Sequence, residues 1–222
     1  MTTAVLLSGG LDSAVLLALE QRDRGPALPI HVRAGLAWED AEADAIAALL
    51  AVPPFAGRTP PLATLAVDVR DVYPPDHWAI AGQPPAFDTP DEDVYLTGRN
   101  IVLISKAAVL CARHGLQSLS LGPLAGNPFP DATPEFFATM ARAMSLGLDT
   151  PIEIRTPLAR LHKEDVIRLG VGLGVPFERT LSCMAPRGGA HCGQCSKCRE
   201  RRDAFAAAGV DDPTRYAVTP PR

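Results

Sequence analysis

The sequence lacks three features that would assign it to a membrane, secreted or nucleic-acid-binding class. It has no run of eighteen uncharged apolar residues, so it offers no transmembrane helix. It has no excess of basic charge, because 21 Lys and Arg against 25 Asp and Glu give a net charge of -4. No basic leader precedes its first apolar run at residues 4–7, which is too short for a signal peptide. We therefore expect a cytoplasmic protein that acts on a small molecule, with no membrane and no nucleic acid as partner.

Cysteine is scarce, and its distribution is uneven. Four of the five cysteines lie between residues 183 and 198, whereas Cys111 stands alone on the apolar face of an expected helix. This clustering is typical of a metal site in a reducing compartment and not of a disulfide framework. Cys111 is expected to be a buried, unreactive thiol.

Apolar runs and helical periodicities alternate along the 222 residues. We expect strands at 4–7, 28–33, 62–69, 119–121 and 152–155, and helices at 13–22, 38–51, 100–113, 134–146 and 163–169. Successive strands separated by helices form parallel sheets, because each crossover carries the chain back to the same edge. The pattern therefore predicts an α/β fold, with helices on both faces of a parallel sheet.

Two segments fall outside this alternation. Residues 70–98 are rich in Pro, Asp and Gly without periodicity, and we expect a partly ordered lid there. Residues 181–222 hold the clustered cysteines and a charged helix, which we expect to pack with the α/β domain of residues 1–180 as part of one domain. The basic residues of that helix are expected on a solvated face, and they are Lys197, Arg199, Arg201 and Arg202.

A glycine-rich turn joins the first strand to the first helix, with the sequence Ser8-Gly9-Gly10-Leu11-Asp12-Ser13. Two glycines let the backbone approach a phosphate, and the helix N-terminus favours the anion. Ser8 and Ser13 add hydroxyl donors, while Asp12 either caps the helix or holds a magnesium ion carried by a nucleotide. Neither a Walker motif nor a dinucleotide fingerprint is present. The alternative is an ordinary turn with an aspartate cap.

The clustered cysteines have the spacing of a closed metal site. Cys183, Cys192, Cys195 and Cys198 follow the pattern C-x8-C-x2-C-x2-C, and four thiolates complete a tetrahedral zinc site with no open position. The site is therefore expected to be structural. Iron–sulfur ligation is the alternative, but the bacterial ferredoxin run ends in C-x3-C-P, which is absent. The adjacent His191 is expected to be a surface spacer.

The glycine-rich turn resembles the SGGxDS phosphate loop of the N-type ATP pyrophosphatases. Together with the cysteines, it makes nearly the whole chain resemble the 7-cyano-7-deazaguanine synthase family, also called the ExsB family. Further motifs that carry this resemblance are Gly98-Arg99-Asn100, Pro130-Asp131, Pro134-Glu135-Phe136, Thr156-Pro157-Leu158 with Lys163, Gly174-Val175-Pro176 and Ser182-Cys183.

The resemblance implies a Rossmann-like fold of the adenine nucleotide alpha hydrolase type, a structural zinc ion, ATP with magnesium, and a homodimer. It implies a ligase of queuosine biosynthesis that adenylates 7-carboxy-7-deazaguanine, forms an amide with ammonia, and dehydrates that amide to a nitrile with a second ATP. Ser8, Asp12 and Ser13 would act in catalysis. Lys163 and Arg99 would be cations on the phosphates or the carboxylate, or else solvated charges at helix ends.

Two segments depart from the family pattern. Residues 34–39 read Ala-Gly-Leu-Ala-Trp-Glu where the family has Tyr-Gly-Gln and basic residues, and residues 125–129 read Ala-Gly-Asn-Pro-Phe where Asp-Tyr-Ser-Gly is common. ATP chemistry is therefore better determined than the substrate. The alternatives are a ligase that joins a carboxylate to a larger amine, a tRNA-modifying ATP pyrophosphatase, and a nucleotide-binding regulator. Trp38 either stacks on a purine or packs within its helix.

Overall fold

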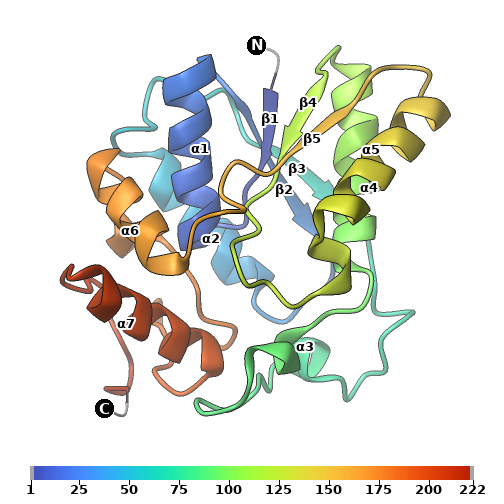
Figure 1. The fold of residues 1–222 in the computed structure, drawn as a ribbon. Helices are drawn as coiled ribbons and strands as arrows, with labels where there is room; N and C mark the ends of the chain where they lie inside the picture. The colour runs from blue at the N-terminus through green and yellow to red at the C-terminus, as the bar shows by residue number, and fades with distance from the viewer. Residues whose placement is uncertain (1–2, 221–222) are drawn as a thin grey trace.

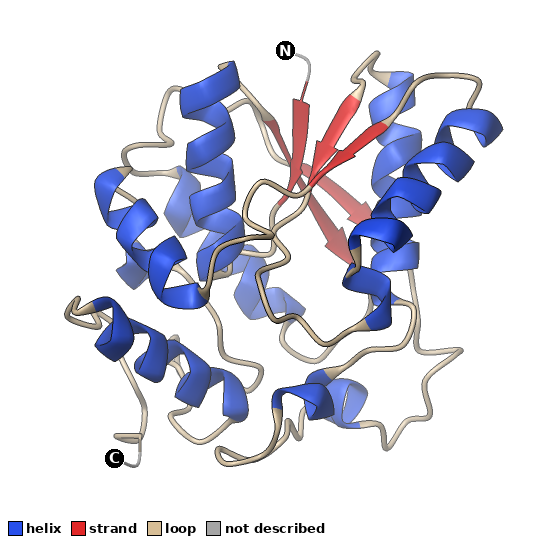
Figure 2. Cartoon of the chain, viewed as in Figure 1, coloured by secondary structure: helices blue, strands red, loops and turns tan. Residues whose placement is uncertain are grey.

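A computed structural model describes residues 3–220 of the chain, and its centre is a parallel five-stranded sheet between two layers of helices (Figures 1 and 2). The strands are β1 (Thr3–Leu6), β2 (Leu28–Arg33), β3 (Ala63–Ala66), β4 (Ser118–Ser120) and β5 (Glu153–Arg155). They lie in the order β3-β2-β1-β4-β5, and every neighbouring pair is parallel. The predicted α/β fold is confirmed.

Helices cover both faces of the sheet. One face carries α1 (Leu11–Arg24), α2 (Glu39–Leu50) and α6 (Lys163–Gly172), and the other carries α4 (Arg99–Arg113) and α5 (Pro134–Gly147) (Figure 1). Successive side chains of a strand point to opposite faces, so Ala4 joins the core beneath α4 and α5, while Val5 joins the core beneath α1 and α6. Burial on both faces explains why residues 4–7, which include most of β1, are an unbroken apolar run.

Local sequence signals place the helix boundaries. Thr133 caps α5, because its hydroxyl oxygen accepts the N–H of Phe136 at 3.1 Å, and Pro134 fills the first helical position as predicted. Three boundaries differ from the expected ones: α1 begins at Leu11 and not at residue 13, α6 continues to Gly172 beyond residue 169, and β3 ends at Ala66 and not at residue 69. The phosphate loop therefore lies partly inside the first helical turn, where unpaired backbone N–H groups point outward.

Residues 70–98 form two short helices, α3 (Trp78–Ala81) and η1 (Asp91–Val94), joined by loops. The rings of Trp38 and Trp78 stack with centroids 5.7 Å apart, and Trp38 is only 6% exposed. Of the two alternatives for Trp38, packing is confirmed. The segment also contacts the C-terminal part of the chain, because the Arg199 guanidinium donates to Thr89 O at 2.7 Å and pairs with Asp91 at 3.0 Å.

The C-terminal segment contains η3 (Phe177–Arg179) and α7 (Ser196–Ala208), and α7 packs on α6. The expectation that all its basic residues are solvated was wrong for Arg201, which is 1% exposed. Its guanidinium donates to Phe177 O at 2.9 Å, to Thr180 Oγ1 at 2.8 Å and to Ser182 Oγ at 3.2 Å. A buried guanidinium needs such acceptors, so Arg201 joins the segment before the cysteines to α7.

His191 was also expected at the surface, and this was wrong. It is 6% exposed, and its Nε2 accepts the N–H of Ser182 at 3.0 Å. Cys111 is fully buried as expected, and burial raises the pKa of its thiol to about 11. No helix within residues 3–220 combines the length and apolarity that crossing a bilayer requires.

Candidate active site and metal centre

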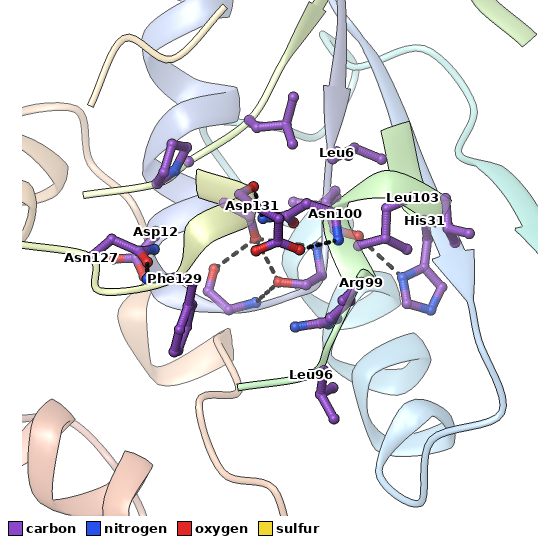
Figure 3. A pocket seen from close by; sticks show the side chains of 18 of the residues that line it. Leu6, Asp12, His31, Leu96, Arg99, Asn100, Leu103, Asn127, Phe129 and Asp131 are labelled. Atoms are coloured by element: carbon purple, nitrogen blue, oxygen red, sulfur yellow. Dashed lines mark hydrogen bonds between the residues drawn. The ribbon is translucent and has the colours of Figure 1, made fainter. Parts of the chain in front are cut away.

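A cavity of about 270 Å³ lies at the carboxyl ends of β1, β2 and β4 (Figure 3). From β1 the chain runs to β2 and β3 on one side of the sheet, and it later returns to β4 on the other side. Ligands of open α/β sheets bind at such a reversal of strand order, outside the carboxyl ends of the strands. Figure 3 shows Asp12 and Asn127 on one side of this cavity and His31 on the other.

The phosphate loop forms one wall of the cavity through Ser8, Gly10, Asp12 and Ser13. Gly10 is the N-cap of α1, and its N–H donates to Ser8 Oγ at 3.3 Å. The Ser8 and Ser13 hydroxyls are 3.3 Å apart, so both lie at the mouth of the helix N-terminus. The Ser13 hydroxyl in turn donates to Gly10 O at 3.0 Å. Two hydroxyls and the first backbone N–H groups of α1 therefore gather beside a positive helix dipole, an arrangement suited to phosphate.

The two remaining loop residues do not line the cavity. Gly9 has φ +76°, and a Cβ there would lie 3.1 Å from Ile46 Cγ1 and 3.2 Å from Glu42 O. Only glycine fits both this conformation and this space. Leu11 is 1% exposed and packs into the core beneath α1 and α6. The side chain of Leu11 therefore anchors the loop, and only its backbone faces outward.

Asp12 does not cap α1 but forms an ion pair with Lys163 at the start of α6, with Oδ2 and Nζ 2.7 Å apart. The other oxygen of Asp12, Oδ1, is buried without a partner. Glu200 Oε1 lies 2.9 Å from the same Nζ. Burial acts to lower the pKa of Lys163, but the charges of Asp12 and Glu200 outweigh it and raise that pKa above its usual value. Lys163 is thus a permanent cation beside the loop, although it does not line the cavity.

Arg99 lines the cavity from the start of α4, and its Nε is buried without a hydrogen-bond partner. The next residue, Asn100, binds η2 (Pro130–Ala132): its backbone N–H donates to Asp131 Oδ2 at 3.0 Å, and its Nδ2 donates to Asp131 O at 2.8 Å (Figure 3). Two motifs that lie 31 residues apart in the sequence therefore form one structural unit that holds Arg99 at the cavity.

Two polar residues of the cavity wall were not predicted from the sequence. His31 Nδ1 donates to Leu7 O at 3.1 Å, which leaves Nε2 as a buried acceptor without a partner. Burial lowers the pKa of His31, which favours the neutral ring. Glu42 is 8% exposed and accepts the indole N–H of Trp38 at 3.1 Å, and burial raises its pKa to about 7. No pattern marked them, since His31 lies within an apolar strand and Glu42 within an acidic stretch of helix.

The two departures from the family pattern have different positions. Asn127 and Phe129 line the cavity, and the ring of Phe129 stacks on Tyr95 with centroids 5.1 Å apart. Residues 34–39 do not line it. Instead, the Glu39 carboxylate accepts the N–H groups of Ala34 and Gly35. The departure at 125–129 therefore contacts the candidate ligand site, whereas the departure at 34–39 supports the start of α2.

The four predicted cysteines converge into one buried cluster, with their sulfurs within 4.8 Å of one another. Neighbouring Sγ atoms are separated by 3.5 Å, 3.8 Å and 3.9 Å. Four sulfurs at a Zn–S distance of about 2.3 Å in a tetrahedron are about 3.8 Å apart. Backbone N–H groups of Ala185 and Cys192 donate to Cys183 Sγ at 3.3 Å and 3.2 Å, which stabilises a thiolate. The cluster can hold one metal ion.

Comparison with known proteins supports the family resemblance that the sequence motifs indicated. The model of the family "Queuosine biosynthesis protein QueC" matches residues 76–209. The 7-cyano-7-deazaguanine synthase of Nitratiruptor sp. is 30% identical over 99% of this chain and 100% of its own length, and that of Azoarcus sp. is 36% identical over 96% of this chain and 95% of its own. A solved U34-tRNA thiolase from Methanococcus maripaludis is 14% identical, with a TM-score of 0.46 over 94% of this chain and 67% of its own length.

The matches to the two synthases extend over the phosphate loop, the cavity and the cysteine cluster alike. A match of this length means that the motifs that suggested the resemblance belong to one shared sequence and are not isolated coincidences. The chain therefore belongs to the QueC family of 7-cyano-7-deazaguanine synthases.

Proposed function

We propose that this protein is an ATP-dependent carbon–nitrogen ligase that converts 7-carboxy-7-deazaguanine and ammonia into 7-cyano-7-deazaguanine. The observation that carries the proposal is the phosphate loop in the wall of a cavity at the strand-order reversal of the sheet. The relatives that match this chain over nearly their full length bear the name of that synthase.

The phosphate loop, residues 8–13, supplies the ATP contacts in this proposal. The backbone N–H groups and the Ser8 and Ser13 hydroxyls bind phosphate oxygens. Asp12 Oδ1, which is buried without a partner, is suited to the magnesium ion that accompanies ATP. Arg99 and Lys163 supply positive charge, with Arg99 in the cavity and Lys163 beside the loop.

In the proposed reaction, the positive charges and donors of the site act on the leaving pyrophosphate. A carboxylate oxygen of the acid bonds to the α-phosphorus, the α–β phosphoanhydride bond breaks, and pyrophosphate leaves with the negative charge. Donors and cations around the leaving group stabilise that charge. Ammonia attacks the acyl carbon and expels AMP, which gives the amide. The amide oxygen then bonds to the α-phosphorus of a second ATP, which releases a second pyrophosphate, and loss of AMP and two protons from that adduct leaves the nitrile.

Other groups that line the cavity are suited to a ring that bears amino groups. His31 Nε2 is an unpartnered acceptor, and Glu42 adds a carboxyl group. Exocyclic amino groups and ring N–H groups of purine-like bases donate to such acceptors. The stacked rings of Tyr95 and Phe129 offer an apolar face for the same ring system.

We propose that the cysteine cluster holds a structural zinc ion. The sulfur separations match one tetrahedral ion, and four thiolates leave no position for a substrate. Zinc would cross-link the cysteine module and would take no part in the reaction. One zinc per chain by elemental analysis supports this assignment, whereas iron with acid-labile sulfide would support a cluster instead.

The test is to incubate the zinc-loaded protein with magnesium ATP, 7-carboxy-7-deazaguanine and ammonium, and to record pyrophosphate release and product mass together. Acid-dependent pyrophosphate and the nitrile mass are expected. ATP binding without acid-dependent pyrophosphate would refute the proposal. As the family resemblance implies, we also expect a cytoplasmic homodimer. Light scattering of the purified protein tests its oligomeric state.

A second candidate is a ligase of the same type that joins the carboxylate to a larger amine and stops at the amide. The observation that favours it is that Asn127 and Phe129, from the segment that departs from the family pattern, line the cavity. Accumulation of an amide that is not consumed by excess ATP would support this candidate. Formation of the nitrile would exclude it.

A further inference from the structure

A row of alternating charges connects the phosphate loop to the cysteine module. Asp12 Oδ2 lies 2.7 Å from Lys163 Nζ, and that Nζ lies 2.9 Å from Glu200 Oε1. The other oxygen of Glu200, Oε2, lies 2.6 Å from Lys197 Nζ. The four residues come from three separate elements: the phosphate loop, the start of α6, and α7, which also carries Cys198.

This row differs from an exposed surface ion pair. Its side chains are 18–28% exposed, and Lys163 is the most buried of them. A lysine side chain is long and flexible, so with one partner its ammonium samples several positions. Two carboxylates on opposite elements restrict the Lys163 ammonium to the space between them. Asp12 alone belongs to the phosphate loop, and Glu200 is the partner that fixes Lys163 from outside it.

The cysteine module is attached to the loop by a second, uncharged contact. The backbone N–H of Leu181 donates to Gly9 O at 2.8 Å. Arg201 separately fastens α7 to the segment that contains Leu181, through Thr180 and Ser182. A change at the Glu200 carboxylate therefore leaves the module in place. The function of Glu200 can be separated from the folding of the module.

We propose that Glu200 is a positioning residue, which holds the Lys163 ammonium beside the phosphate loop so that its charge meets the leaving pyrophosphate. The inference rests on the proposed function, in which Lys163 is a cation for the phosphates. It assigns to α7 of the cysteine module a direct part in the geometry of the ATP site. Glu200 itself does not contact the substrate.

The test is a double-mutant cycle of Glu200→Gln and Lys163→Met, with kcat for acid-dependent pyrophosphate release as the readout. Glu200→Gln keeps the shape of the side chain and removes its charge. Misplacing a catalytic group by about 1 Å costs up to about a hundredfold in rate, so a loss of about tenfold or more in kcat is expected. In the Lys163→Met background the same change is expected to have no further effect, because Glu200 acts through Lys163.

The matched control is Asp203→Asn, which removes a carboxylate from the same helix that pairs only with the neighbouring Arg202 in the described structure. It is expected to leave kcat unchanged. Zinc content and melting temperature are measured for every variant, and Glu200→Asp replaces Glu200→Gln in the cycle if the latter fails to fold. Equal losses from Glu200→Gln with and without Lys163 would overturn the inference, since a merely structural residue acts independently of Lys163.

A second measurement separates this inference from the proposed function. The four proteins of the cycle are titrated with magnesium ATP alone, and Glu200→Gln is expected to weaken binding severalfold only where Lys163 is present. If the native protein releases no pyrophosphate with the acid, the proposed function fails. The dependence of the Glu200→Gln effect on Lys163, measured as ATP affinity, still tests the role of Glu200. Additive losses of affinity would overturn it.

Discussion

The buried carboxyl group of Glu42 predicts how the stability of the protein depends on pH. The residue is 8% exposed at the wall of the cavity, and burial raises the pKa of its carboxyl group from 4.5 to about 7. The native state therefore retains a proton that the unfolded chain loses at lower pH. Stability must fall as the pH rises from about 4.5, and the loss is complete once the pH exceeds about 7.

The magnitude follows from the size of the shift. Each pKa unit corresponds to about 1.4 kcal/mol, so the ionised carboxylate costs about 3 kcal/mol in total. About 2 kcal/mol of this cost develops between about pH 5.5 and 7. Glu42→Gln keeps an acceptor for the Trp38 indole N–H and removes the ionisation. When the pH is raised from about 5.5 to 8, the unfolding free energy of the variant relative to that of the native protein is expected to increase by about 2 kcal/mol.

The assay is urea denaturation of both proteins at several pH values and constant free zinc, with the difference in unfolding free energy plotted against pH. Glu92→Gln is the control, because Glu92 is an exposed glutamate of η1. A difference between Glu42→Gln and the native protein that does not change with pH would mean that Glu42 ionises near its ordinary pKa, and would refute the reasoning.

Three further predictions concern packing, the loop and the metal. Gly170→Ala places a Cβ 2.4 Å from Phe177 Cζ, so a loss of about 1–3 kcal/mol is expected in urea denaturation. Gly9→Ala forces a side chain into a positive-φ position 3.1 Å from Ile46 Cγ1, and at least about tenfold weaker ATP binding is expected by calorimetry. Cys192→Ser removes one of four thiolates, so loss of bound zinc and a lower melting temperature are expected from elemental analysis and thermal denaturation.

Each of these changes has a control within the chain. A Cβ on Gly172, also in α6, meets no atom within 4 Å, so Gly172→Ala is expected to leave stability nearly unchanged. A Cβ on Gly147 in α5 is equally free, and Gly147→Ala should bind ATP normally. Cys111→Ala should retain the full metal content. Native-like ATP binding by Gly9→Ala, or native zinc content in Cys192→Ser, would contradict the assignments of the loop and the cluster.

Features that depend on residues close together in the sequence could be predicted from it. The loop at residues 8–13 and the cap at Thr133 rest on local backbone geometry, and the structure contains both. The cysteine spacing predicted a cluster because each C-x2-C turn presents two sulfurs to one point. The βαβ alternation predicted a parallel sheet, but the position of β4 beside β1 is not written in any local pattern.

The errors arose where a residue's surroundings come from distant segments. The helix of residues 196–208 has charged residues at 197 and at every position from 199 to 203, so its pattern indicates a solvated face. Arg201 is nevertheless buried, because acceptors from residues 177–182 surround it. His191 likewise accepts a hydrogen bond from Ser182, nine residues earlier. Spacing cannot indicate such partners, since they depend on how the chain returns on itself.

The sequence by itself therefore determined the α/β fold, the phosphate loop and the four metal ligands, because each depends on periodicity or on residues that are close along the chain. Only the tertiary structure decided which groups line the cavity. His31, Glu42 and Arg99 meet at one cavity from β2, α2 and α4, and Glu200 reaches Lys163 from α7. The chemistry of these groups is set by burial and by charges from other elements, which exist only once the sheet and its helices have packed.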